Sequence, residues 1–119
     1  LEEAELILLI IDGNIGMTEE DKKLYAREVI RLELSLKSAQ DLKTENDHII
    51  CMRHYPPFNA KTEDSEFTKL FEKYGVEKVI YGHLHGKGGR TIIQNNKNGI
   101  DYYLTSCDKV QNKLVTIIE

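Results

Sequence analysis

The sequence predicts an α/β fold with helices packed on a largely parallel sheet. Short aliphatic segments that end at turn residues alternate with longer segments whose apolar residues recur at helical spacing. This alternation gives the order βαβαβ, and the last third of the chain predicts a β meander. The 119 residues contain no linker-like or low-complexity stretch. We therefore expect a single domain over residues 1–119.

The first predicted strand, residues 5–11, is almost entirely aliphatic and stops at a Gly-Asn turn. Thr18 is expected to cap a long helix over about residues 19–42, with acidic residues in the first turn, where the helix dipole favours them. The apolar residues of this helix recur every three or four positions, which predicts one buried face: Tyr25, Val29, Leu32, Leu36 and Ala39.

The second predicted strand, residues 47–52, stops before two prolines that cannot extend a sheet ladder. Residues 62–65 offer caps for a second helix, which Gly75 is expected to end. A third strand, residues 76–81, leads into a glycine-rich loop over residues 82–89. Beyond it, the sequence predicts a hairpin with an Asn-Gly turn at residues 98–99 and a final strand over residues 114–118.

Composition limits the possible functions and location of the chain. The net charge is −4 and no basic stripe is present, which argues against general nucleic-acid binding. The aliphatic run at residues 6–11 is too short to span a bilayer, so we expect no membrane association. Cys51 and Cys107 are far apart in sequence and are expected to be reduced and buried in a cytoplasmic protein. Because the chain starts at Leu1 and not at methionine, we expect a fragment or a processed product.

Three histidines follow the ends of predicted strands. His54 comes after the second strand, and His83 and His85 come after the third. Ligands of α/β sheets bind at the C-terminal ends of strands. In a loop flanked by Gly82 and Gly86, the two nearby histidines can straddle a pair of ions about 3.5–4 Å apart. Imidazole suits Zn, Fe, Mn or Co, so the sequence predicts a transition-metal site.

The R-H-Y-P-P segment at residues 53–57 and the Y-G-H-L-H-G segment at residues 81–86 resemble the last two motifs of the calcineurin-like metallophosphoesterase superfamily. Residues 21–36 and 102–108 look most like a bacterial group of predicted phosphohydrolases, Ser/Thr phosphatase-like, within it. The resemblance runs from about residue 18 to the end. It implies that the chain is the C-terminal portion of the metallophosphoesterase α/β/β/α sandwich.

The resemblance also implies a function and a set of ligands. His54 and His83 would bind one divalent ion (Mn, Fe, Zn or Co), and His85 would bind a second. The intact enzyme would hydrolyse a phosphate-ester substrate with a hydroxide activated by the two metals. The family's earlier D-x-H, G-D and G-N-H-[DE] motifs do not occur before His54, so no catalytic residue is assigned. We expect this chain alone to hold at most one ion, weakly, and to hydrolyse phosphate esters poorly or not at all.

One segment has two interpretations. The D-G-N-I segment at residues 12–15 is either a degraded G-N-H-[DE] motif, with Asn14 as a metal ligand, or an ordinary turn. Ile15 occupies the place of the expected histidine. The preference of Gly and Asn for turns favours the second interpretation.

Several other residues are candidates for substrate binding. Arg53 either contacts a phosphate or, as we expect, faces solvent. Asn59 either bonds substrate or caps a turn. Arg90, with Lys87, attracts an anionic substrate or is simply a surface charge. Tyr55 and Phe58 wall a pocket or pack beneath the loop, whereas His48 is expected to be structural. Cys107 and Asp108 offer ligand atoms, but their spacing does not predict a structural zinc site.

A rival interpretation assigns no catalysis to the chain. In this interpretation the chain is a remnant or binding module that keeps the scaffold without a complete metal site. A missing N-terminal half would leave a sheet edge exposed, which favours self-association.

Overall fold

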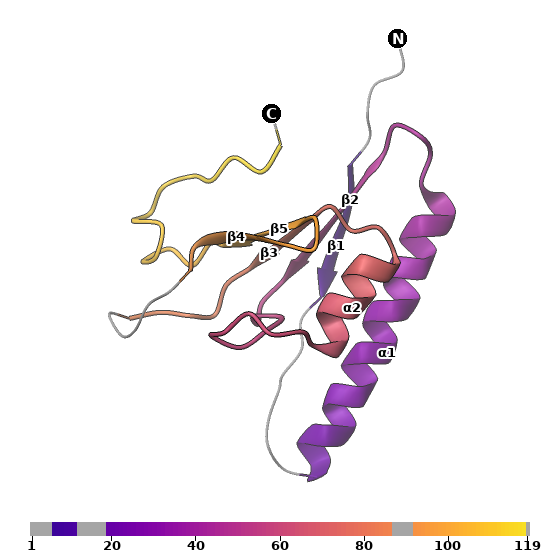
Figure 1. Ribbon diagram of the computed structural model, residues 1–119, viewed down its shortest axis with the longest axis horizontal. Coiled ribbons are helices and arrows are strands. Elements are labelled where there is room, and N and C mark those ends of the chain that lie inside the picture. The colour runs from indigo at the N-terminus through magenta and orange to yellow at the C-terminus, as the bar shows by residue number, and fades with distance from the viewer. Residues whose placement is uncertain (1–5, 12–18, 87–91, 119) are drawn as a thin grey trace.

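Two helices and five strands follow one another in a computed structural model that describes residues 6–11, 19–86 and 92–118 (Figure 1). The structure confirms a small α/β protein with a mixed, open sheet. Its elements are β1 (Leu6–Ile11), α1 (Glu19–Leu42), β2 (His48–Arg53), α2 (Glu66–Lys73), β3 (Lys78–Tyr81), β4 (Gln94–Lys97) and β5 (Ile100–Leu104).

The strand order is β1-β2-β3-β5-β4. The pairs β1–β2, β2–β3 and β3–β5 are parallel, and β4 is antiparallel to β5. Met52 of β2 is in register with Ile80 of β3, so these two strands end side by side. Contact continues just past the strands, because the Gly82 amide donates to the His54 carbonyl over 3.0 Å. The loops that carry the histidines therefore leave the sheet together.

Both helices lie on one face of the sheet, and the main core lies between them and the strands (Figure 1). The predicted face of α1 is confirmed, since its last three members are buried and its first two are partly buried. The largest fully buried side chain is Tyr102, which belongs to β5 and packs against Phe71 and Phe58. The buried cluster consists of Leu32, Leu36, Ala39, Ile49, Cys51, Phe67, Leu70, Phe71, Tyr74, Val76, Val79, Tyr81, Ile100, Tyr102 and Leu104.

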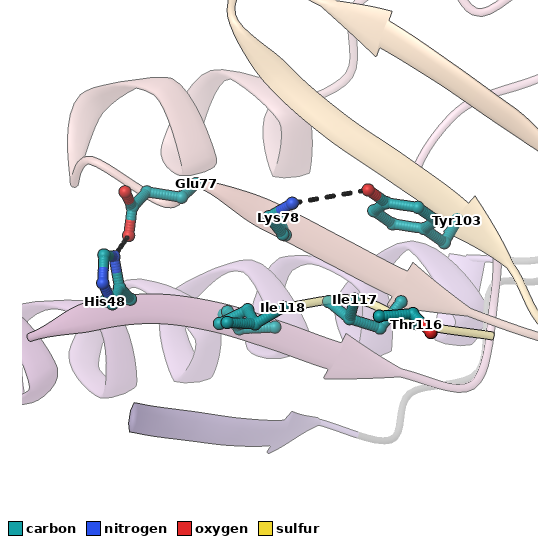
Figure 2. Close-up of a pocket in the computed structure, with 8 residues that line it drawn as sticks. His48, Glu77, Lys78, Tyr103, Thr116, Ile117 and Ile118 are labelled. Carbon is teal, nitrogen blue, oxygen red and sulfur yellow. Dashed lines mark hydrogen bonds and ion pairs between the residues drawn. The ribbon is translucent and has the colours of Figure 1, made fainter. Parts of the chain in front are cut away.

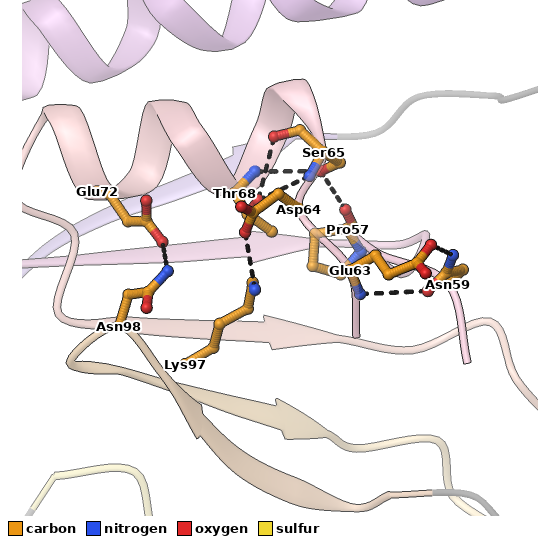
Figure 3. A network of polar contacts seen from close by, with 9 residues as sticks. All are labelled: Pro57, Asn59, Glu63, Asp64, Ser65, Thr68, Glu72, Lys97 and Asn98. Atoms are coloured by element: carbon orange, nitrogen blue, oxygen red, sulfur yellow. Dashed lines mark hydrogen bonds and ion pairs between the residues drawn. The ribbon is translucent and has the colours of Figure 1, made fainter. Parts of the chain in front are cut away.

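Helix α2 has well-defined ends. Ser65 is its N-cap and accepts from the Thr68 amide, while the Thr68 hydroxyl accepts from the Ser65 amide. At the other end, Gly75 adopts a φ of +70°, as predicted for a terminating glycine. Figure 3 shows two polar contacts between this region and the β4–β5 hairpin: Asp64, just before the cap of α2, pairs with Lys97 of β4, and Glu72 of α2 accepts from Asn98 in the turn. These contacts fix the hairpin against the helix layer.

The prediction of a β meander is wrong in one respect. The hairpin forms, and Asn98 and Gly99 have the positive φ angles of its tight turn. However, β5 is inserted between β3 and β4 and pairs with β3 in parallel. The side chains explain this order. Strand β5 is largely buried and suits the interior, whereas β4 (Q-N-N-K) is polar and suits an edge.

The predicted strand over residues 114–118 is also wrong. Both sides of β5 are already paired, so the chain after it has no free edge of that strand to join. Residues 116–118 instead lie against the second face of the sheet, where they line a cavity of about 400 Å³ together with Ile50, Lys78 and Tyr103 (Figure 2). His48 and Glu77 form an ion pair at this cavity, which is in keeping with the structural role expected for His48.

No helix in the described part of the chain combines the length and the apolar character needed to cross a membrane.

Candidate metal centre

The ends of β2 and β3 bring two of the three histidines into contact. His54 directly follows β2, and His83 lies two residues beyond β3. Their nitrogens, His54 Nε2 and His83 Nδ1, are 3.2 Å apart, and both side chains are exposed. The pairing of the two parallel strands produces this proximity, as expected for ligand positions at strand ends.

The distance between these nitrogens suits a shared ion. Two nitrogens bound to one tetrahedral ion at about 2.0–2.1 Å lie about 3.3 Å apart. The same separation suits an N–H···N hydrogen bond in which one ring donates to the other. Tyr55 packs against both rings, with centroid separations of 4.7 Å to His54 and 4.5 Å to His83. The Tyr55 ring thus packs against both imidazoles.

The backbone at His83 is unusual. Its φ is +70°, and the Leu84 amide donates to the Gly82 carbonyl over 2.8 Å, so His83 is the central residue of a strained γ-turn. Non-glycine residues rarely adopt this region, and holding one there costs about 1–3 kcal/mol. Strain of this kind concentrates at functional sites. The turn presents the His83 ring to His54.

His85 lies apart from this pair. Its Nδ1 is 2.8 Å from Asp108 Oδ1, and the second carboxylate oxygen accepts from the Gly86 amide over 2.7 Å. Among the described residues, no hydrogen bond or ring contact joins His85 to His54 or His83. Cys107 completes a group in which one ligand atom each from His85, Cys107 and Asp108 lies within 4.8 Å of the others, and all three residues are exposed.

The Asp108 carboxylate is strongly stabilised in its charged form. The hydrogen bond from the Gly86 amide, followed by that from His85, lowers the pKa of Asp108 to about 2. The group is therefore an ionised acceptor across the ordinary pH range.

Arg53 is not solvent-facing, and that expectation was wrong. The residue is only 5% exposed. Its Nε donates to the Tyr55 carbonyl over 2.8 Å, and its guanidinium lies 4.0 Å above the Phe67 ring. The side chain therefore points toward the helix layer. Contact between Arg53 and a phosphate stays a prediction.

Asn59 caps a turn. Its side-chain oxygen accepts from the Lys61 and Glu63 amides, and its side-chain nitrogen donates to Glu63 (Figure 3). Phe58 packs on Tyr81 and Tyr102, so it contributes to the core. Substrate contact through Asn59 stays a prediction.

The remaining sequence predictions divide into three groups. Cys51 is buried and reduced, as expected, but Cys107 is reduced and exposed, so its predicted burial is wrong. Asn14, Lys87 and Arg90 lie outside the described residues. The sequence indicates Asp108 only as a possible ligand together with Cys107, and it does not predict the contact of Asp108 with His85. The strand-end rule alone could not find it, because Asp108 lies near His85 only once β5 is the parallel neighbour of β3.

The chain matches no protein-family model, and neither the curated proteins nor the solved structures include a significant match to it. The resemblance to metallophosphoesterases therefore stays a prediction.

Proposed function

We propose that this chain is the C-terminal part of a calcineurin-like metallophosphoesterase and that His54 and His83 bind one divalent ion between them. One observation carries the proposal: two exposed imidazole nitrogens lie 3.2 Å apart at the ends of neighbouring parallel strands. The strained backbone of His83 supports it, because a residue under strain at a strand end indicates a functional constraint.

Each residue has a distinct part in this proposal. His54 and His83 ligate through ring nitrogens, and Tyr55 limits the movement of both rings. His85 is the proposed ligand of the second ion. Bound divalent ions would lower the pKa of water and offset charge on a phosphate ester. We therefore propose that the substrate is a phosphate ester. We also propose that the protein is cytoplasmic.

The number of ions follows from charge. Two divalent ions held close together repel each other, and neutral imidazoles do not offset that charge. The family's bridging aspartate belongs to a G-D motif that does not occur before His54. We therefore propose that the chain alone holds at most one ion, weakly, of the Mn, Fe, Zn or Co class.

Metal content after equilibrium dialysis against Mn or Zn tests this proposal. We expect up to one ion per chain in the wild type and a clear loss of binding in His54→Ala and in His83→Ala. His48→Ala is the matched control, because His48 pairs with Glu77 at the start of β2. Two tightly held ions per chain, or binding that neither His54→Ala nor His83→Ala changes, would contradict the proposal.

A non-catalytic remnant or binding module is the alternative, and one observation favours it. In the described part of the chain, β1 is an edge strand whose outer side has no partner. An exposed edge favours self-association through strand pairing. Activity on bis-p-nitrophenyl phosphate with Mn separates the two functions. Loss of activity in His83→Ala supports the enzyme, whereas activity that this substitution leaves unchanged supports the remnant.

A further inference from the structure

The loop after β3 is held to the turn after β5 by one carboxylate. Asp108 binds His85 through Oδ1 and the Gly86 amide through Oδ2, at 2.8 and 2.7 Å. Lys109 adds a bond from its Nζ to the Gly86 carbonyl. The amide and the carbonyl of Gly86 are therefore both bound by consecutive residues of the neighbouring turn.

The turn that carries Asp108 is itself well ordered by hydrogen bonds. The Lys109 and Val110 amides donate to the Ser106 carbonyl over 2.9 and 3.1 Å, and the Asn112 amide donates to the Cys107 carbonyl over 2.7 Å. The turn is also continuous with the sheet, since the Thr105 amide donates to the Tyr81 carbonyl over 2.9 Å. The Asp108 carboxylate is thus a fixed point relative to β3.

The hydrogen bond has a consequence for the His85 ring. An ionised carboxylate is only an acceptor, so Nδ1 of His85 must carry the proton that is shared with Asp108. In the neutral ring, Nε2 then has a free lone pair. Histidines that ligate metals usually donate their other ring N–H to a carboxylate, which fixes both the tautomer and the ring orientation.

We propose that Asp108 is the positioning residue for His85 and holds it in the tautomer whose Nε2 is free to ligate a metal ion. This inference rests on the proposed function, in which His85 ligates a metal ion. The hydrogen bond between His85 and Asp108, however, forms without a bound ion. Without Asp108, the exposed ring would rotate, and the Gly86 backbone, at a φ of +93°, would lose its fixed amide.

A different use of the same residues is an ion bound directly by His85, Cys107 and Asp108. The structure favours the positioning role, because His85 Nδ1 and Asp108 Oδ1 are already bonded to each other. An ion held by both atoms would replace that bond. Cobalt distinguishes the two arrangements, since a thiolate ligand produces a charge-transfer band in the near ultraviolet.

The decisive measurement is the tautomer of His85 in the metal-free, ¹⁵N-labelled chain, from long-range ¹H–¹⁵N spectra. We expect wild-type His85 to be protonated at Nδ1 and bare at Nε2, and Asp108→Ala to give a mixture of tautomers. Asp41→Ala, which removes an exposed carboxylate from α1, should leave the His85 signals unchanged. A wild-type ring protonated at Nε2 would overturn the inference, and this readout remains valid if Asp108→Ala does not fold.

Titration with zinc, followed on the same signals, provides the second readout. Because the chain alone holds at most one ion, we expect one equivalent of zinc to shift the His54 and His83 signals and to leave wild-type His85 protonated at Nδ1. A cobalt–thiolate band in the wild type that disappears in Cys107→Ser would overturn the positioning role. Failure of the proposed function has a different signature: zinc would leave the His54 and His83 signals unchanged while His85 kept its tautomer.

Discussion

Arg53 shows how a single side chain can organise the chain around a site. It is the last residue of β2, and its Nε bonds the carbonyl of Tyr55, two residues later. The bond therefore fixes the backbone on both sides of His54. The guanidinium is buried against Phe67 of α2, so the direction of the His54 loop depends on the helix layer.

Replacing Arg53 by alanine should destabilise the protein by about 2 kcal/mol. The substitution removes a desolvated cation–π contact and leaves the Tyr55 carbonyl without its donor. The measurement is the free energy of unfolding in urea. Arg27→Ala, on the exposed side of α1, is the control and should change this free energy by less than about 0.5 kcal/mol. Equal effects at the two positions would show that the burial of Arg53 has no energetic importance.

The alternation of β2 contained the information that would have placed Arg53 correctly. Ile49 and Cys51 face the helix layer, and Arg53 is the next residue on that face. The charge suggested solvent, but a long side chain can bury its stem and planar head against an aromatic ring. The charge of Arg53 indicated exposure to solvent, whereas its place in the strand alternation indicated burial. The alternation was the correct indication.

At the scale of elements, α2 depends on its first residues. Eight residues are too few for a stable isolated helix, so caps and packing must compensate. Ser65 provides the capping box and also donates from its hydroxyl to the Pro57 carbonyl. The start of α2 is therefore bound to the loop that follows β2, and both functions depend on one hydroxyl group (Figure 3).

Ser65→Ala should lower the free energy of unfolding by about 1 kcal/mol, since it removes the N-cap acceptor. Urea denaturation of the two proteins measures the difference. Ser38→Ala is the matched control, because Ser38 is exposed inside α1, where alanine is the better helix former. We expect that variant to be more stable than the wild type by a few tenths of a kcal/mol. A Ser65→Ala protein as stable as the wild type would contradict the importance of the cap.

The sequence predicted the hairpin more successfully than its place in the sheet. Turn chemistry at residues 98–99 is local, so it could be recognised without knowing the fold. The position of β5 inside the sheet depends on its pairing with β3, and the exclusion of residues 114–118 depends on the pairing of both sides of β5. Such competition between distant segments cannot be predicted from local sequence patterns.

At the scale of the whole molecule, the sheet separates two different environments. One face is closed by α1 and α2, and the other carries residues 116–118 and an open cavity (Figures 1 and 2). The ionisable groups buried on the helix side include Cys51, Tyr81 and Tyr102. Burial raises the pKa of Cys51 and of Tyr81 to about 12 each, and it raises the pKa of Tyr102 further.

Stability should therefore decrease in alkali. The unfolded chain releases these protons near their ordinary pKa values, whereas the folded protein retains them until the raised values are reached. The loss of stability begins near pH 9 and grows toward pH 12, by up to about 1.4 kcal/mol per pH unit for each group. Urea midpoints at increasing pH measure it.

Tyr102→Phe is the control for this alkaline effect. Among the described residues, the Tyr102 hydroxyl has no hydrogen-bond partner, so the substitution should cost little at neutral pH. Its stability should decline less steeply with pH than that of the wild type. Parallel decline in both proteins would exclude Tyr102 as a source of the effect.

The candidate site, like the fold, was predicted only where local sequence patterns determine it. Strand ends could be placed from the sequence, and the structure brings His54 and His83 together there. The partner of His85 could not be placed, because it depends on the insertion of β5 beside β3. The histidines were recognised from their own motifs, but the contact that supports His85 comes from Asp108, 23 residues later.

The γ-turn at His83 also has an evolutionary consequence. Glycine would adopt this backbone conformation without strain. Replacing His83 by glycine should therefore relieve the strain of the turn and stabilise the fold. Only a use for the imidazole can oppose that gain over many generations. We expect that, among descendants of a common ancestor, copies that have lost His54 will also have drifted to glycine at position 83.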